Sequence, residues 1–432
     1  MPWPNQSILT SALSHFWIMK KLNTNIFGFT AILASLFLFL TTFTNAFASE
    51  ADYREFLSDS EKTRMNFSFN GQEALPPFTR SKGSSALTVF PNSIEIYSVS
   101  DTIQNLQLQL SNVGGSALGW TLDPGATILL FSSGPVINRP QEGPKNTDLS
   151  LMESLTLGMN MFGFGANVDV GVRLANELIL EQPAEINSIH FVGYQIGVGP
   201  TSPFTGLSLQ LWEGPPNAGG KLIYGNMQTN VLESSSWTEA WRSSETGFDD
   251  LRALSDLIAN PSIHESLDLV ANTYWLDFAY SSEQPGPLFS PPIATFGQIA
   301  ETGTALQYIP EELGEPESGW IEIRDWNGTE ARQGLPIQVY GTLAVHLETL
   351  PCSPIETIPW LEAFDITGQI AAGSQSTLEL SLDSTSLEPG TYVADLCIAN
   401  SGAGSPVMSV EIMLNVTGDS VFEDRFESDI RE

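Results

Sequence analysis

The sequence predicts an all-β protein in which one β-sandwich is interrupted by a second one. Leu106, Leu108 and Leu110 alternate with polar residues, which is the period of a half-buried strand. The same period returns far along the chain, over 378–382 and 408–416. Between these stretches, short apolar runs alternate with glycine- and proline-rich turns, a pattern that is typical of a β-sandwich or jelly roll.

The first half of the interrupted sandwich is expected over 86–124. A glycine-rich turn at 112–115 precedes a strand over 118–122, in which Trp120 is large enough to fill a sandwich core. The following residues, 125–150, contain several prolines and glycines, and we predict that they form a linker.

The inserted domain, a second β-sandwich or jelly roll, is expected over 151–344. Its candidate strands include 207–212 and 273–278. One stretch departs from the strand pattern, because the apolar residues from Phe248 to Ile258 fall near helical spacing and a proline follows them. A short helix is therefore predicted there.

The second half of the first sandwich is expected over 345–417. A core tryptophan, Trp360, lies near its start, and a tight turn at 388–390 separates its alternating strands. The last residues, 418–432, form an acidic tail.

The chain contains two cysteines, Cys352 and Cys397. In an exported chain such a pair is expected to form a disulfide, and two buried free thiols are the alternative. A zinc site would need further cysteine or histidine ligands. Both cysteines lie in the second half, so the bridge cannot join the two halves. Strand pairing and packing around Trp120 and Trp360 must do so.

The first 48 residues are predicted to be a signal peptide. Lys20 and Lys21 precede an apolar run over 26–43, and small residues ending at Ala48 follow it. Met19 is an alternative start, and an uncleaved membrane anchor is the alternative reading of the apolar run. Residues 49–85 are expected to be a flexible lead-in to a mature chain without stable membrane insertion.

The formal net charge of the chain is −33. This charge repels the phosphates of nucleic acids and anionic lipids, so neither is an expected partner. An extracellular protein or a polysaccharide remains compatible with it. With the signal peptide, this indicates a location outside the cell or on its surface.

The sequence contains no motif that indicates catalysis or a cofactor. His190, His264 and His346 lack metal-ligand spacing, and there is neither a G-x-S-x-G elbow nor a P-loop. The acidic run from Glu301 to Glu317 is expected to be a solvated loop. We therefore predict no catalytic residue and no cofactor, and leave open a structural calcium ion in the sandwich loops.

The tryptophans of the inserted domain fall into two expected classes. Trp212 and Trp275 lie in strand patterns and are expected to fill a core. Trp237 and Trp241 lie four residues apart in a stretch rich in serine and threonine, so they are the candidates for stacking against a ligand.

The two outer segments resemble the halves of secreted bacterial Ig-like domains of the BACON/ASH type. The C-terminal half is similar in the order of its motifs, from Trp360 through Gly368, Gly373 and Tyr392 to Asn400. The N-terminal half is similar over 112–120. The resemblance implies an immunoglobulin-like sandwich, in which the inserted domain falls between the tryptophan strand and the first cysteine.

The inserted region and the tail carry two further resemblances. Residues 211–216, 273–277 and 334–342 are similar to a β-sandwich module of exported gammaproteobacterial proteins. This resemblance implies no known activity. It implies a location outside a Gram-negative cell or on its surface, with the periplasm as the alternative. The segment from Phe422 to Phe426 resembles a short C-terminal motif of such proteins, although Arg425 stands where that motif has glycine.

These features favour a secreted or cell-surface protein without catalytic activity, with a binding, adhesion or structural role. A carbohydrate-binding module is one alternative, and tryptophans clustered on one sheet face would favour it. A secreted hydrolase that uses carboxylates is the other, and it would need two convergent carboxylates in a pocket.

N-terminal sequencing of the secreted protein is expected to begin near Ser49, because signal peptidase cleaves after small residues such as Ala48. The membrane fraction of the same culture is the control. A segment from Lys20 to Ala48 that is still attached in that fraction would show a retained anchor instead.

Overall fold

The computed structural model describes residues 85–245, 247–263, 266–299, 301–313, 318–326, 328–345 and 352–418. Over these residues the chain forms four β-sheets, and its helical segments are short 3₁₀ turns, so the predicted all-β class is confirmed. None of those turns has the length and apolar character of a membrane-spanning helix. The predicted signal peptide, the lead-in up to residue 84 and the tail beyond residue 418 lie outside the described residues.

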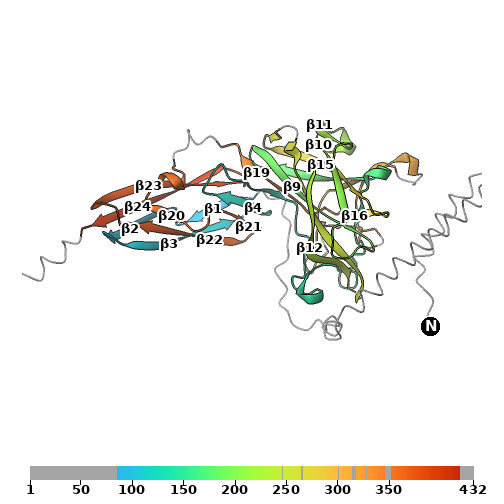
Figure 1. Cartoon of the computed structure of the whole chain (residues 1–432), viewed down its shortest axis with the longest axis horizontal. Helices are drawn as coiled ribbons and strands as arrows, with labels where there is room; N and C mark the ends of the chain where they lie inside the picture. The colour runs from blue at the N-terminus through green and yellow to red at the C-terminus, as the bar shows by residue number, and fades with distance from the viewer. Residues whose placement is uncertain are drawn as a thin grey trace, which may run out of the picture. The chain divides into compact units, whose positions relative to one another are not determined.

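The first sandwich is built from both ends of the described chain, so that blue and red strands lie together in Figure 1. Its strands are β1 (Leu87–Phe90), β2 (Ser93–Val99), β3 (Ile103–Asn112), β4 (Leu118–Thr121), β20 (Leu361–Ala363), β21 (Thr367–Ile370), β22 (Gln375–Asp383), β23 (Gly390–Asn400) and β24 (Val407–Thr417). One sheet has the order β1-β3-β22-β20, and the other has the order β2-β24-β23-β4-β21.

Strands from the two halves pair directly with each other in both sheets. In the first sheet, β3 is antiparallel to β22, with Leu108 opposite Leu378. In the second sheet, β4 lies between β21 and β23, so that Trp120 is opposite Gly368 on one side and Asn400 on the other. Backbone hydrogen bonds between distant segments therefore close the sandwich.

The apolar side chains between these sheets form one core. Trp120 and Trp360 are 3% and 6% exposed, and both belong to this core. Gly368 is required beside Trp120, because a Cβ at that position would lie 2.7 Å from Nε1 of the indole. The core draws side chains from both halves, including Leu108, Leu110, Leu118, Leu378, Leu380, Leu396, Ile398, Val410, Ile412 and Leu414.

The predicted disulfide between Cys352 and Cys397 is confirmed. Cys397 lies on β23 and is almost completely buried. Next to the bridge, the backbone N–H of Cys397 donates to Ser353 O at 3.0 Å, and Ser353 N donates to Asp395 O at 2.6 Å. The bridge thus fastens the segment that leaves the inserted domain onto a central strand of the sandwich.

The inserted domain is a second two-sheet sandwich. Its strands are β5 (Ile128–Ser132), β6 (Asp148–Met152), β7 (Phe164–Gly165), β8 (Arg173–Leu180), β9 (Ala184–Gln195), β10 (Phe204–Glu213), β11 (Lys221–Asn226), β12 (Leu232–Ser244), β13 (Gly247–Ala259), β14 (Asp268–Leu269), β15 (Asn272–Ser282), β16 (Leu288–Ser290), β17 (Leu306–Ile309), β18 (Gly319–Glu322) and β19 (Ile337–Leu343). A six-stranded sheet has the order β11-β10-β15-β8-β17-β18. The larger sheet has the order β5-β19-β9-β13-β12-β6. The short strands β14 and β16 pair with β9, and β7 pairs with β16.

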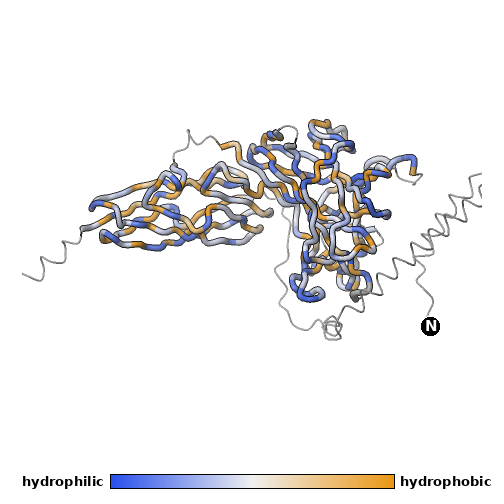
Figure 2. The backbone as a smooth tube through the Cα atoms, in the orientation of Figure 1, coloured by the Kyte–Doolittle hydropathy of each residue, from blue (hydrophilic) through white to orange (hydrophobic). Residues whose placement is uncertain are grey.

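Several strands, among them β3 and β22 of the first sandwich and β19 of the inserted domain, follow the alternation that half-buried sheets require. Hydrophobic and hydrophilic residues alternate along the tube of Figure 2. In the inserted domain, the inward side chains of the two sheets meet in one core, to which Leu174, Phe191 and Phe278 contribute.

The predicted linker over 125–150 is wrong at both of its ends. β5 pairs with β19 and β6 pairs with β12, so both segments belong to the larger sheet of the inserted domain. The prolines and glycines mark only the loop between these strands. The short apolar runs on either side of that loop are strands, because they are buried in the sheet: Leu129 is 2% exposed and Leu149 is 3% exposed.

The predicted helix from Phe248 to Ile258 is also wrong, because β13 occupies this stretch. β13 is an interior strand between β9 and β12. Both of its faces are covered, since Leu257 packs in the main core and Leu254 packs with Tyr194 on the opposite face. Apolar residues on both faces of a strand give a spacing of three, which imitates a helix.

Replacing Cys352 and Cys397 together by serine is expected to lower the free energy of unfolding by about 4 kcal/mol, because the bridge closes a loop with a sequence separation of 45 residues. Denaturant unfolding followed by tryptophan fluorescence would measure the loss. The unsubstituted protein treated with a reductant is the control and should lose the same amount. Equal unfolding midpoints for the oxidised protein and the double variant would contradict the prediction.

Candidate functional site

The outer face of the six-stranded sheet carries aromatic and charged side chains. The strand register places Trp212 opposite Trp275 and Gln210 opposite Asp277. On the neighbouring strands, Tyr308 lies opposite both Arg173 and Trp320. The alternate residues of β8, β10 and β15 point into the main core. We call the outward group the aromatic cluster, which consists of Arg173, Gln210, Trp212, Trp275, Asp277, Tyr308 and Trp320.

Arg173 is held in one position by the residues around it. Its guanidinium carbon lies 4.4 Å from the ring centroid of Tyr308 and 5.2 Å from that of Trp320. Its Nη1 donates to Gln210 Oε1 at 3.2 Å and to Asp277 Oδ2 at 3.1 Å. Its Nε and Nη2 make no hydrogen bond to any described residue. With 18% of its side chain exposed, Arg173 has a fixed guanidinium with spare donors.

Asp277 is the buried carboxylate beneath this arginine. Its side chain is 0% exposed, and Trp212 Nε1 donates to its Oδ2 at 3.2 Å. Its other oxygen, Oδ1, has no hydrogen-bond partner within the described part of the chain. Burial raises the pKa of Asp277 to about 7, against the opposing effects of Arg173 and the Trp212 N–H.

The rings of the cluster differ in how much of them solvent can reach. Trp275 is buried, whereas Trp212, Tyr308 and Trp320 are half-buried. Trp212 and Trp320 pack against a small apolar group of Ala175, Trp275 and Leu306. The rings of Tyr308 and Trp320 meet edge to face, with centroids 5.3 Å apart. Packing therefore fixes these rings, and each keeps a partly exposed surface.

The aromatic residues selected from the sequence lie elsewhere, on β12. Trp241 is 4% exposed, so it cannot stack against a ligand, and that expectation is wrong. Trp237 is half-buried, packs edge to face against Trp241 at 5.7 Å and donates from Nε1 to Ala240 O at 3.3 Å. The strand register shifts between these two residues, which turns Trp241 into the interior.

The other residues considered from the sequence do not form a site. His190 is half-buried, with Nδ1 3.2 Å from Asp256 Oδ2 and its ring 4.9 Å from that of Tyr340. His264 and His346 lie outside the described residues. Glu311 and Glu312 are exposed on a 3₁₀ turn. Within the described ranges, no group of three or more His, Cys, Asp or Glu side chains could hold a metal ion.

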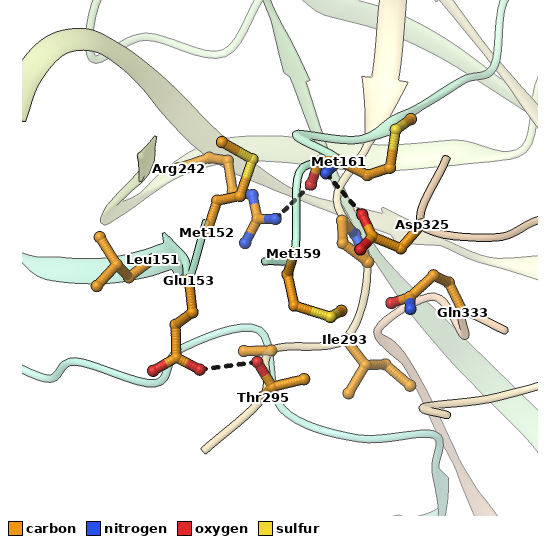
Figure 3. A pocket seen from close by; sticks show the side chains of 12 residues that line it. Leu151, Met152, Glu153, Met159, Met161, Arg242, Ile293, Thr295, Asp325 and Gln333 are labelled. Atoms are coloured by element: carbon orange, nitrogen blue, oxygen red, sulfur yellow. Dashed lines mark hydrogen bonds between the residues drawn. The ribbon is translucent and has the colours of Figure 1, made fainter. Parts of the chain in front are cut away.

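A second group of charged side chains lines a small cavity between loops of the inserted domain (Figure 3). Its two carboxylates, Glu153 and Asp325, are buried, and each of their oxygens accepts a hydrogen bond. Glu153 accepts from Arg139 and Thr295, both at 2.9 Å. Asp325 Oδ1 accepts from two backbone N–H groups, and its Oδ2 accepts from the N–H and hydroxyl of Thr329.

Arg242 completes this buried group, because its guanidinium donates to Met161 O at 2.7 Å and to Phe162 O at 3.0 Å. Burial lowers the pKa of Arg242 to about 10, so the side chain still carries its charge at neutral pH. The cavity has room for about one water molecule. These charges hold loops in place and leave no carboxylate oxygen for a substrate.

Comparison with known proteins gives only weak similarities. No protein-family model matches the chain, and no curated protein does. An ASH/PapD-like domain of human CEP192 aligns with a TM-score of 0.21 at 6% identity, over 82% of this chain and 99% of that domain. A protein of unknown function from Porphyromonas gingivalis aligns with a TM-score of 0.14 at 12% identity, over 35% and 78%. The CupB6 tip adhesin of Pseudomonas aeruginosa aligns with a TM-score of 0.11 at 8% identity, over 77% and 99%. At these scores none of the similarities supports a family or a function.

The raised pKa of Asp277 predicts a pH-dependent stability. The folded protein keeps this proton up to a pH of about 7, whereas the unfolded chain releases it near 3.8. The contribution of this carboxyl to stability is therefore complete below pH 3.8 and is lost as the pH rises through 7. The difference between the pKa of Asp277 in the folded protein and in the unfolded chain corresponds to about 4 kcal/mol of folding stability.

Asp277→Asn should remove this dependence. Urea unfolding gives the free energy of unfolding of the unsubstituted protein and of the variant at each pH. The value for the unsubstituted protein minus that for the variant is expected to fall by about 4 kcal/mol between pH 4 and pH 8. The same substitution at the exposed Asp268 controls for the loss of one carboxylate. A difference that stays constant or rises over this range would contradict the prediction.

Proposed function

We propose that the chain is an exported, non-catalytic binding protein whose inserted domain contacts the ligand through the aromatic cluster. The observation that carries this proposal is the concentration of Trp212, Tyr308 and Trp320 around Arg173 on one sheet face. The disulfide and the predicted signal peptide support export. The resemblance of the outer segments to secreted BACON/ASH-type domains supports a carrier role for the first sandwich.

The composition of the cluster is suited to binding. Tryptophan, tyrosine and arginine are the side chains that most often dominate the energy of a binding surface. Arg173 is held by two aromatic rings and two hydrogen bonds, so a ligand would not have to order it. Because ordering flexible side chains opposes binding, a preorganised arginine with spare donors favours it.

The first sandwich presents a different kind of surface. Gln107, Gln109 and Glu379 are exposed on its four-stranded sheet, and they hydrogen-bond to one another or to neighbours across the strands. These hydrogen bonds join polar side chains of neighbouring strands to one another. We therefore assign this sandwich the role of a platform that holds the inserted domain.

The proposal is tested by labelling the full mature chain and measuring its binding to intact cells and extracellular material by flow cytometry. Trp320→Ala is expected to reduce cluster-dependent binding at least tenfold, since it removes a partly exposed ring and one support of Arg173. Trp326→Ala is the matched control, because Trp326 is a 44% exposed tryptophan of the same domain outside the cluster.

Thermal unfolding of both variants would show that they are folded. Binding that falls equally in the two variants, or in neither of them, would contradict the assignment of the aromatic cluster as the binding surface.

A further inference from the structure

We infer that the ligand of the aromatic cluster is a neutral glycan, whose sugar rings pack on the exposed parts of the aromatic rings while Arg173 and Gln210 bind hydroxyl groups. This inference rests on the proposed function of the same face. Three observations support it: the partial exposure of the aromatic rings, the polar atoms of Arg173 and Gln210 that have no partner among the described residues, and the charges around them.

The exposure of the rings fits a sugar better than a protein. Trp212, Tyr308 and Trp320 are each half-buried, and Trp275 behind them is buried. Each ring therefore keeps an exposed part, against which the C–H face of a sugar ring can pack. A protein interface of standard size buries about 800 Å² on each partner and has a broad apolar centre, which these rings do not provide.

The spare polar groups are planar and lie next to the rings. Arg173 has Nε and Nη2 without an acceptor among the described residues, and Gln210 Oε1 is fixed by Arg173 Nη1. This contact orients the amide of Gln210, whose Nε2 has no acceptor in the described chain. A fixed guanidinium and a fixed amide can each donate more than one hydrogen bond, so they can bind the oxygens of neighbouring hydroxyl groups.

Glu177 adds acceptors at the same face, because the register places it opposite Trp275. Its Oε2 accepts from the hydroxyl of Thr304 at 3.4 Å, and no donor within the described residues reaches its Oε1. The face therefore offers both donors and a carboxylate acceptor beside aromatic rings. Sugar hydroxyls, which both donate and accept, match this combination.

The charge distribution favours a neutral ligand over an anionic one. The chain has a formal net charge of −33, which repels polyanions at long range. Within the cluster, Arg173 Nη1 lies 3.1 Å from Asp277 Oδ2, and Asp277 offsets the charge of Arg173 only above its pKa of about 7. Glu322 lies on β18 at the edge of this face, and Arg324 and Arg332 pair with it at 2.6 and 3.0 Å. With Glu177 included, three carboxylates stand against these three arginines once Asp277 is ionised, so above a pH of about 7 the face has no net positive charge to hold a uronate or a sulfate.

The experiment is a glycan array probed with the full mature chain, followed by calorimetry of the best ligands. Neutral glucans, mannans, galactans and xylans are compared with uronate-rich and sulfated polysaccharides. We expect binding to at least one neutral glycan, with an affinity that falls at least tenfold in Trp320→Ala and in Arg173→Lys. Arg173→Lys keeps the charge and removes the planar fork, so it separates hydrogen bonding from electrostatics.

Trp326→Ala should bind as the unsubstituted chain does, and thermal unfolding would show that each variant is folded. If Trp320→Ala fails to fold, Arg173→Lys alone decides the outcome. An acidic glycan or a protein bound through the same cluster would overturn the inference and leave the proposed function standing. Neutral-glycan binding that both cluster variants retain, or the absence of any cluster-dependent binding, would overturn both.

Discussion

The backbone pairing between segments from the two ends of the described chain is the interaction on which the structure depends. β3 finds its partner in β22, and β4 finds its partners in β21 and β23. Without these contacts, the first sandwich has neither a closed sheet nor a shared core around Trp120 and Trp360. The disulfide cannot replace them, because both of its cysteines belong to the second half. The inserted domain is likewise attached to a platform that exists only when both halves are paired.

Alternation made much of this fold predictable, because a half-buried strand leaves a period of two in its sequence. The leucines of β3 and β22 carry that period clearly, and they face each other in the sheet. Prediction failed where a strand is covered on both faces, since the buried Leu254 and Leu257 of β13 then resemble one face of a helix. It failed again at β5 and β6, where short strands flank a loop rich in proline and glycine and the loop dominated the pattern.

The candidate site was largely hidden from the sequence for a different reason. Its members come from β8, β10, β15, β17 and β18, and only the strand register shows that Arg173, Asp277 and Trp320 share one face. A usable signal did exist, since Trp212 and Trp275 alternate with core residues in phase with Gln210 and Asp277. This places them on the polar side of their strands. Trp237 and Trp241 stood out through their polar neighbours, but a local shift in register buried one of them.

The pairing of β5 with β19 has a consequence for the order in which the chain folds. The first strand of the inserted domain lies beside its last one, with Ile128 opposite Gly341, so the domain's two connections leave from neighbouring positions. Once this domain has folded, the long loop between the two halves acts as a short one, and the entropy lost when β3 meets β22 becomes small. An inserted domain that misfolds would instead leave β3 and β4 with open edges, which are templates for aggregation. Correct folding of the first sandwich thus depends on the folding of the domain inserted into it.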